Sequence, residues 1–339
     1  MVLLAYGTRP EYIKIKPLID IFNKEGFSYK ILFTGQHKDL LKEQKIDFQL
    51  EIPETNNNRL NEIVKSTMTK YFSWILTEGI NPTHVLVQGD TTSVLAVALS
   101  AFHHEIKVIH LEAGLRTYDN QNPYPEEQNR RIVSQITDIH LCPTELSRMN
   151  LENERILGEK FVVGNTVLDN LLKYKEKCEY TDKVLVTMHR RENHHWLAEW
   201  FKEIDDLAQT HLDLEFIIPL HPNPNVQKHK HLLKNVKVVE PMSHEELLEL
   251  LIKTKLVITD SGGIQEECSF FNKKCLTCRK VTERPEAIGQ STFMVESPDK
   301  LKEIFNYNII NNEIDYICPF GNGNSAEKIY NILSKIING

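Results

Sequence analysis

The stretch from Thr259 to Glu267, which reads TDSGGIQEE, combines small residues and carboxylates in an order suited to binding a phosphate. It follows an apolar, β-rich run and leads directly into residues with helical spacing, which predicts a strand, a tight turn and a helix N-terminus. Gly262 and Gly263 would let the backbone approach a ligand closely, and the first amides of the helix and its dipole favour an anion. Glu267, one turn into the helix, is better placed to accept hydrogen bonds from hydroxyl groups on the same ligand. A sugar joined to a diphosphate has both features.

The same stretch has a purely structural interpretation. Asp260 or Ser261 could cap the helix, with the two glycines serving only to make the turn. These residues alone do not decide between the two interpretations.

Polar side chains also follow the other predicted strands. Each could serve as a cap, a turn former or a solvated charge, but their shared location at strand ends is a stronger signal than any one of them. Carboxylates beside arginines and histidines suit a reaction in which protons move to and from a sugar while a phosphate is restrained. These residues are Arg9, Glu11, Asp90, Glu112, the run His189-Arg190-Arg191-Glu192, His221 and Ser261.

Strand-like and helix-like segments alternate almost throughout the chain, which predicts parallel sheets covered by helices on both faces. We therefore expect an α/β protein with two doubly wound domains, residues 1–172 and 173–323, divided in the charged stretch Lys173 to Lys183. Residues 324–339 should form a C-terminal helix that could return to the N-terminal domain. Ligands of such sheets bind beyond the carboxyl ends of the strands, which places the predicted site in a cleft between two facing domains.

The amino-acid composition and net charge of the chain argue against some classes of binding partner. The chain has 339 residues, 41% of them hydrophobic, and 40 Lys and Arg against 47 Asp and Glu, which gives a net charge of -7. A mildly acidic chain without a basic run is a poor candidate for binding nucleic acid or an anionic membrane surface. We find no membrane-span pattern and no signal-peptide pattern, so we expect a cytoplasmic protein whose six cysteines are thiols. Cys275 and Cys278 form a C-x-x-C without a second pair, and no zinc or redox role is expected of them.

Eight spaced motifs give the chain a resemblance to the non-hydrolysing UDP-N-acetylglucosamine 2-epimerases. They run in order over nearly the whole chain: Gly7-Thr8-Arg9-Pro10-Glu11 with Lys14, Gly89-Asp90-Thr91-Thr92, Glu112-Ala113-Gly114-Leu115-Arg116-Thr117, Pro125-Glu126-Glu127 with Asn129-Arg130, Gly164-Asn165-Thr166, His189-Arg190-Arg191-Glu192, Ser261-Gly262-Gly263-Ile264-Gln265-Glu266-Glu267 and Thr282-Glu283-Arg284-Pro285-Glu286. The resemblance implies the glycosyltransferase-B architecture of two Rossmann-like domains, and a homodimer. It also implies epimerisation at carbon 2 of a UDP-N-acetylhexosamine without a cofactor or metal, by elimination of UDP and its re-addition to a bound 2-acetamidoglucal.

The same resemblance assigns roles to residues. It implies catalytic roles for Asp90, Glu112, Glu126 and His221, and substrate binding by Arg9, Lys14, Ser261, Gly262, Gly263, Glu267 and Arg284. Which carboxylate removes the proton stays open. Gln36 and His37 match part of a regulatory UDP-sugar site in bacterial members of the family, whereas Ser66 replaces an expected arginine, so activation by substrate is not expected.

Departures from the family pattern bear on the substrate. Met242 and Leu247 stand where the family usually has Gln and Phe near the uracil ring, and His194-His195-Trp196 replaces small residues after the His-Arg-Arg-Glu motif. These changes leave room for a 6-deoxy UDP-N-acetylhexosamine. Three further alternatives are a glycosyltransferase, a non-catalytic nucleotide-sugar sensor and a hydrolysing epimerase.

Overall fold

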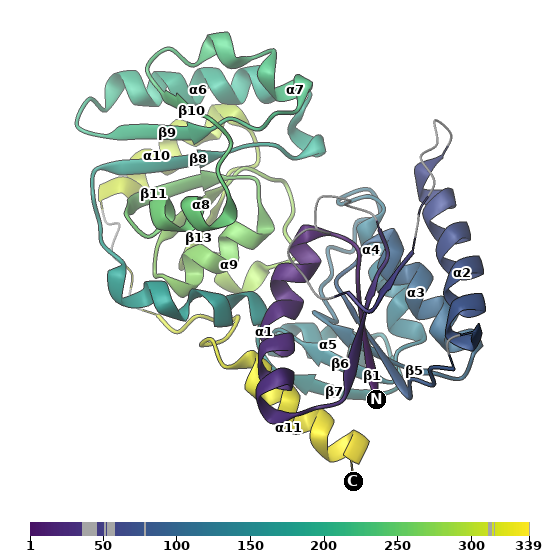
Figure 1. Ribbon diagram of the computed structural model, residues 1–339. Coiled ribbons are helices and arrows are strands. Elements are labelled where there is room, and N and C mark those ends of the chain that lie inside the picture. Colours follow the sequence, from purple (N-terminus) through teal and green to yellow (C-terminus); the bar gives the residue numbers. More distant parts are fainter. Residues whose placement is uncertain are drawn as a thin grey trace. The chain divides into compact units, whose positions relative to one another are not determined.

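The computed structural model describes residues 1–35, 46–50, 52, 58–77, 79–310, 314 and 316–338. The chain forms two compact units (Figure 1). Unit 1 consists of Met1–Asn170 and Gly321–Gly339, and unit 2 consists of Leu171–Phe320. The chain passes from unit 1 to unit 2 inside a 3-10 helical segment, η2 (Thr166–Lys177), which extends into the charged stretch where the sequence predicts a boundary.

Unit 1 is built on a parallel sheet, which within the described residues has the order β3-β2-β1-β4-β5-β6-β7. The strands are β1 (Val2–Tyr6), β2 (Tyr29–Phe33), β3 (Phe48–Gln49), β4 (His84–Gln88), β5 (Lys107–Leu111), β6 (Ile139–Cys142) and β7 (Glu159–Val162). The helices are α1 (Arg9–Glu25), α2 (Arg59–Thr77), α3 (Thr92–His103), α4 (Glu126–Gln135), α5 (Glu145–Asn153) and α11 (Ser325–Asn338).

Strand β1 shows why the sheet is covered on both faces. Val2, Leu4 and Tyr6 pack into one apolar cluster with α1 and α11, whereas Leu3 and Ala5 pack into a second cluster with α3. A strand buried on both faces needs apolar residues at every position, since successive side chains point to opposite faces. Helix α11 therefore belongs to the core of unit 1, where it lies beside α1 (Figure 1).

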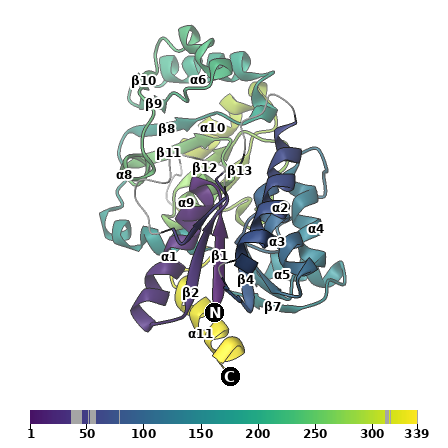
Figure 2. The same cartoon turned by 45° about the vertical axis from the view of Figure 1, so that its right-hand side comes forward.

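Unit 2 repeats the plan with a second parallel sheet, whose described strands have the order β10-β9-β8-β11-β12-β13. The strands are β8 (Lys183–Thr187), β9 (Glu215–Pro219), β10 (Lys237–Val239), β11 (Thr254–Thr259), β12 (Lys274–Thr277) and β13 (Thr292–Met294). The α-helices are α6 (Leu197–Thr210), α7 (Pro224–Gln227), α8 (His244–Leu251), α9 (Gly262–Phe270) and α10 (Leu301–Ile310), with short 3-10 turns η3 (Arg191–Asn193), η4 (Lys230–Leu232), η5 (Pro285–Ala287) and η6 (Pro298–Lys300). Figure 2 shows the strands of both sheets from a second direction. The predicted α/β class with two doubly wound sheets is confirmed.

The strand orders locate the place in each sheet where a ligand is expected. In unit 1 the chain builds outward from β1 in one direction and from β4 in the other, and in unit 2 it does so from β8 and β11. Parallel sheets bind ligands at such switch points, beyond the carboxyl ends of the strands. The segments that leave β1 and β4 carry Lys14 and Asp90, and those that leave β8 and β11 carry His189 and Ser261.

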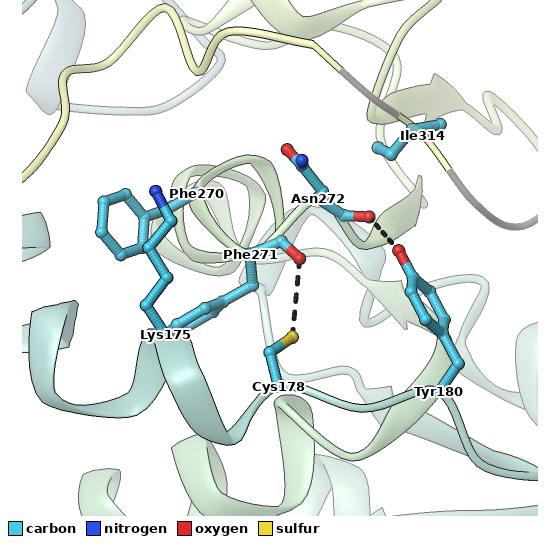
Figure 3. A pocket seen from close by; sticks show the side chains of 7 residues that line it. All are labelled: Lys175, Cys178, Tyr180, Phe270, Phe271, Asn272 and Ile314. Carbon is cyan, nitrogen blue, oxygen red and sulfur yellow. Dashed lines mark hydrogen bonds between the residues drawn. The ribbon is translucent and has the colours of Figure 1, made fainter.

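A pocket of about 330 Å³ lies elsewhere in unit 2, at the C-terminal end of α9 (Figure 3). Here the Cys178 thiol donates to the carbonyl of Phe271, and the Tyr180 hydroxyl donates to the carbonyl of Asn272 at 2.5 Å. These bonds fasten the chain before β8 to the end of α9. The described residues that line the pocket are Lys175, Cys178, Tyr180, Phe270, Phe271, Asn272 and Ile314, and the predicted site residues are not among them.

All six cysteines are free thiols, and Cys275 and Cys278 are fully buried.

Candidate active site

Glu112 forms the centre of the polar group in unit 1. It follows β5 with a φ of 68°, in the left-handed region that residues other than glycine rarely adopt. Its carboxylate accepts hydrogen bonds from Lys14 Nζ at 2.6 Å to each oxygen, from Gln88 Nε2 at 2.5 Å and from Asn165 Nδ2 at 3.1 Å. Three chain segments thus hold one carboxylate in place, and strain of this kind persists where the surroundings impose it.

Asp90, which lies beyond the end of β4, is held from helix α4. Arg130 donates to the Asp90 Oδ2 atom from Nε at 2.8 Å and contacts it from Nη2 at 2.7 Å. Asn129 donates from Nδ2 to the Asp90 carbonyl at 2.8 Å. Glu126 is the first residue of α4, so the helix that orients Asp90 also carries the third predicted carboxylate.

Glu11 joins the turn after β1 to the turn after β4. Its buried carboxylate accepts from the amides of Gly7 and Thr8 at 2.6 Å and 3.0 Å, and from the hydroxyl of Thr91 at 2.7 Å. Burial raises the pKa of Glu11, and the nearby Asp90 acts in the same direction, while its three hydrogen bonds oppose the shift. Glu11 thereby fixes the distance between the ends of β1 and β4. The nearby side chain of Arg9 is exposed.

Asp260 connects the two central strands of unit 2. It is fully buried and accepts from the amide of His189 at 3.0 Å, from the amide of Arg190 at 2.8 Å and from Asn193 Nδ2 at 3.2 Å. Asp260 thus turns back to hold the loop after β8, and the interpretation of this residue as a helix cap is wrong. Ser261 is the N-cap of α9, and its side chain makes no capping bond.

We expect Asp260→Ala to lower the free energy of unfolding of unit 2. Its removal leaves the amides of His189 and Arg190 without their acceptor, at a cost of about 1–3 kcal/mol for each donor that stays buried. Chemical denaturation of the full chain measures the change. The control is Asp206→Ala, which makes the same substitution at an exposed position of α6. Equal stabilities of the two variants would show that the Asp260 contacts contribute nothing.

Gly262 faces a buried ionic network. A Cβ atom at this position would lie 2.5 Å from Arg284 Nη1 and 3.0 Å from Glu283 Oε1. Arg284 donates to Glu266 from Nε and to Glu283 from Nη1, and Arg279 donates to Glu283 from Nη1 at 3.1 Å. The first glycine of the motif is therefore required by the guanidinium that packs against it, whereas a Cβ atom at Gly263 would meet only Ser261 Oγ, at 3.9 Å.

Glu267 presents one buried carboxylate oxygen for a ligand. Its Oε1 atom lies 2.8 Å from His244 Nε2, and its Oε2 atom has no hydrogen-bond partner within the described part of the chain. The side chain of Glu267 is 5% exposed. Buried carboxylate oxygens are normally hydrogen-bonded, so hydroxyl donors of a ligand fit this position.

His189 and His221 stack on one another after neighbouring strands of unit 2. Their ring centroids lie 5.4 Å apart and their planes differ by 12°. Burial lowers the pKa of both imidazoles, and the Asp260 carboxylate opposes the shift in each case. Both shifts favour the neutral form of the imidazole ring.

Sequence comparison identifies the family. A family model described as UDP-N-acetylglucosamine 2-epimerase matches residues 20–334. The UDP-N-acetylglucosamine 2-epimerase of Campylobacter jejuni is 36% identical over 98% of this chain and 97% of its own length. The chain belongs to the UDP-N-acetylglucosamine 2-epimerase family. The resemblance carried by the eight motifs is thereby confirmed.

Solved structures agree with this membership of the epimerase family. The crystal structure of UDP-GlcNAc 2-epimerase from Neisseria meningitidis bound to UDP-GlcNAc matches with a TM-score of 0.89 at 35% identity, over 98% of this chain and 99% of that one. The epimerase of Methanocaldococcus jannaschii in complex with UDP-GlcNAc and UDP matches with a TM-score of 0.82 at 33% identity, over 98% and 99% of the two chains. MurG of Acinetobacter baumannii, at 12% identity and a TM-score of 0.62, shares the fold alone. The glycosyltransferase-B-like class of fold is confirmed.

The predicted site residues of this epimerase family member divide between the units. Lys14 and Glu112 are brought into direct contact. Unit 1 holds Arg9, Lys14, Asp90, Glu112 and Glu126, and unit 2 holds His221, Ser261, Gly262, Gly263, Glu267 and Arg284. Gln36 and His37 lie outside the described residues.

Sequence reasoning assigned no role to two residues that orient Glu112. Gln88 ends the apolar strand β4, and a polar residue that ends such a strand is the signal that could have found it. Asn165 belongs to the Gly164-Asn165-Thr166 motif after β7, but its contact with Glu112 was not predicted. Within the described residues, no helix combines the length and apolarity that a membrane crossing needs.

Proposed function

We propose that the protein interconverts UDP-N-acetylglucosamine and UDP-N-acetylmannosamine by epimerisation at carbon 2. Membership of the epimerase family supports this reaction, and so do the names of relatives that match the whole chain. The observation that carries it is the content of the two switch points: a helix start in unit 2 that suits an anion, and the carboxylates of Glu112 and Asp90, held by hydrogen bonds, in unit 1.

The proposed reaction begins with an elimination. A carboxylate of unit 1 removes the proton from carbon 2, the electron pair forms a double bond between carbons 1 and 2, and the bond from carbon 1 to the UDP oxygen breaks with its electrons leaving on UDP. UDP then adds back to carbon 1 of the bound 2-acetamidoglucal, while a proton is delivered to the opposite face of carbon 2. Every atom is conserved and no oxidant is needed. Asp90, Glu112 and Glu126 are the proposed acid–base set.

Departure of UDP requires donors that stabilise negative charge as it develops, and such donors are most effective when they are fixed in advance. We propose that the amides that follow Ser261 at the start of α9 supply this stabilisation, together with Arg9, Lys14 and Arg284. Lys14 has a second role in this scheme, because its contact with both oxygens of Glu112 holds that carboxylate in position.

We expect Glu267→Gln to weaken UDP binding by about tenfold or more, because hydrogen bonds to a charged acceptor contribute about 1.5–3 kcal/mol. In the wild type, Oε2 of Glu267 would accept from the ribose hydroxyls, and the amide of glutamine offers a donor there instead. Titration calorimetry with UDP and with its 2′,3′-dideoxy analogue measures the effect. The wild type should lose affinity for the analogue and the variant should not. An equal loss of affinity for the analogue in both proteins would show that Glu267 does not contact the ribose hydroxyls.

Proton NMR of UDP-N-acetylglucosamine with the enzyme in deuterated buffer tests the proposed function. We expect UDP-N-acetylmannosamine to form with deuterium at carbon 2. A glycosyltransferase would give no isomer, a nucleotide-sugar sensor would give no exchange, and a hydrolysing epimerase would release UDP and free N-acetylmannosamine. Any of these three outcomes would overturn the proposal. The 6-deoxy analogue is offered in parallel, because Met242 and Leu247 depart from the family pattern, and a higher kcat/KM for it would assign the substrate.

We also propose that the enzyme is a cytoplasmic homodimer, as its family resemblance implies. Light scattering of the purified chain tests the dimer, and cell fractionation tests the location. A monomer at micromolar concentration would contradict the first proposal.

A further inference from the structure

The pocket at the C-terminal end of α9 has no part in the proposed reaction. It lies within unit 2, and the amides proposed to bind the diphosphate of UDP are at the opposite end of the same nine-residue helix. At about 1.5 Å of rise per residue the two ends are about 13 Å apart, so a ligand in the pocket would not overlap with a diphosphate at Ser261. A volume of about 330 Å³ is in the range of sites that bind small molecules.

Hydrogen bonds hold the walls of this pocket in place. The Cys178 thiol and the Tyr180 hydroxyl donate to the two carbonyls at the end of α9 (Figure 3). The buried ammonium of Lys273 lies 3.8 Å from the centre of the Tyr180 ring. It donates to the carbonyl of Thr254 at 2.8 Å and to that of Glu179. A ligand that enters a site with fixed walls needs to order few side chains, which favours binding.

The apolar part of the pocket is mainly aromatic. Phe270 and Phe271 are both buried, and their rings meet edge to face with the centroids 5.3 Å apart. Ile314 adds an aliphatic side chain to the lining. Pairs of aromatic rings attract one another beyond the gain from burial alone, so a ligand with an aromatic ring suits this surface.

The charge of the pocket comes from Lys175, which is the one charged side chain among its described lining residues. The Nζ atom lies 4.8 Å from the centre of the Phe270 ring, and Lys175 forms no ion pair within the described part of the chain (Figure 3). Cys178 and Tyr180 already donate to carbonyls, so this ammonium and the side-chain amide of Asn272 are the donors left for a ligand. An anionic group is therefore favoured beside the aromatic wall.

We propose that the pocket at the end of α9 binds a small molecule that carries an aromatic ring and a carboxylate. The ring lies against Phe270 and Phe271, and the carboxylate pairs with Lys175. This site is separate from the one proposed for UDP-sugars, so both ligands can be bound at once.

Phenylacetate is the probe for this site, because it combines the two features in few atoms. Its binding to the full chain is measured by ligand-observed NMR titration, with and without UDP. We expect a Kd of about 1 mM or lower, and about fivefold weaker binding of phenylacetamide, which lacks the charge. Absence of binding, or equal binding of the amide, would overturn the proposal. Displacement of phenylacetate by UDP would place it at the start of α9 and would overturn the proposal as well.

Two substitutions assign the binding to the pocket. Lys175→Met should lower the affinity for phenylacetate to that for phenylacetamide, whereas the control Lys177→Met, at a second exposed lysine of η2, should not change it. Cys178→Met fills part of the pocket and should weaken the binding of both probes by about tenfold. Thermal unfolding verifies that each variant is folded. Wild-type affinity for phenylacetate in Lys175→Met would overturn the proposal even if Cys178→Met failed to fold.

Discussion

Replacing Glu112 by glutamine should reduce deuterium incorporation at carbon 2 by at least about a hundredfold, the scale of lost general acid–base catalysis. Lys14 contacts both oxygens of this carboxylate at 2.6 Å, and Gln88 donates to one of them at 2.5 Å. The amide of glutamine cannot accept all of these bonds, because its NH2 group must face a donor. The variant loses a charge at the site and also the geometry that three donors impose.

The experiment compares turnover with ligand binding. Affinity for UDP should change much less than turnover in Glu112→Gln, because the α9 amides and Arg284, which are proposed to bind UDP, belong to unit 2. Glu145→Gln makes the same chemical change on the exposed ion pair of Glu145 with Arg148 in unit 1, and it should retain full activity. Wild-type-like exchange by Glu112→Gln would remove Glu112 from the catalytic set.

Gly262→Ala should have the second-largest effect, on stability and UDP affinity together. The new methyl group would lie 2.5 Å from Arg284 Nη1, and the guanidinium is held between Glu266 and Glu283. Forcing extra volume into a packed site costs about 1–3 kcal/mol. Displacement of Arg284 should also weaken UDP binding by about tenfold, the equivalent of 1.4 kcal/mol.

Gly263→Ala is the matched control, because its methyl group would meet only Ser261 Oγ, at 3.9 Å. Alanine is also the better helix former, so the Tm of this control should stay the same or rise. Thermal unfolding of both variants shows whether an added methyl group lowers the Tm only at position 262. Equal losses of Tm would show that the crowding of Arg284 does not matter.

Much of the fold could be predicted from apolar runs. β1, β2 and β4 coincide with apolar runs in the sequence, because each is a five-residue strand that packs apolar side chains on both faces of the sheet. β3 has only two residues, Phe48 and Gln49, and so short a strand leaves no periodicity to detect. η2 runs into the charged stretch around Lys173, where polar composition indicates a linker although the backbone is helical.

The sequence predicts that the carboxylates of the site lie at strand ends, but it does not predict which side chain forms a hydrogen bond with each of them. Glu112 and Asp90 follow their strands as expected. Their partners come from positions far away in the chain, since Asn165 lies 53 residues from Glu112 and Arg130 lies 40 residues from Asp90. No local pattern specifies contacts of that range, and they follow only once the sheet order is known.

Asp260 illustrates the same limit on a shorter scale. A carboxylate before a helix is usually its cap, but here Asp260 turns away from α9 and accepts from the amides of His189 and Arg190. The amides at the start of α9 and the amides of the loop after β8 compete for this carboxylate. The sequence of the α9 segment alone does not show which of them it binds.

The packing of α11 into the core of unit 1 has a consequence for biosynthesis. Ala326, Ile329 and Leu333 complete an apolar cluster whose other buried members lie between Val2 and Val163. A ribosome therefore makes all of unit 2 before it makes the last piece of unit 1. One face of the N-terminal sheet therefore stays incompletely covered until α11 has been synthesised, so unit 1 cannot complete its core while unit 2 is still being made.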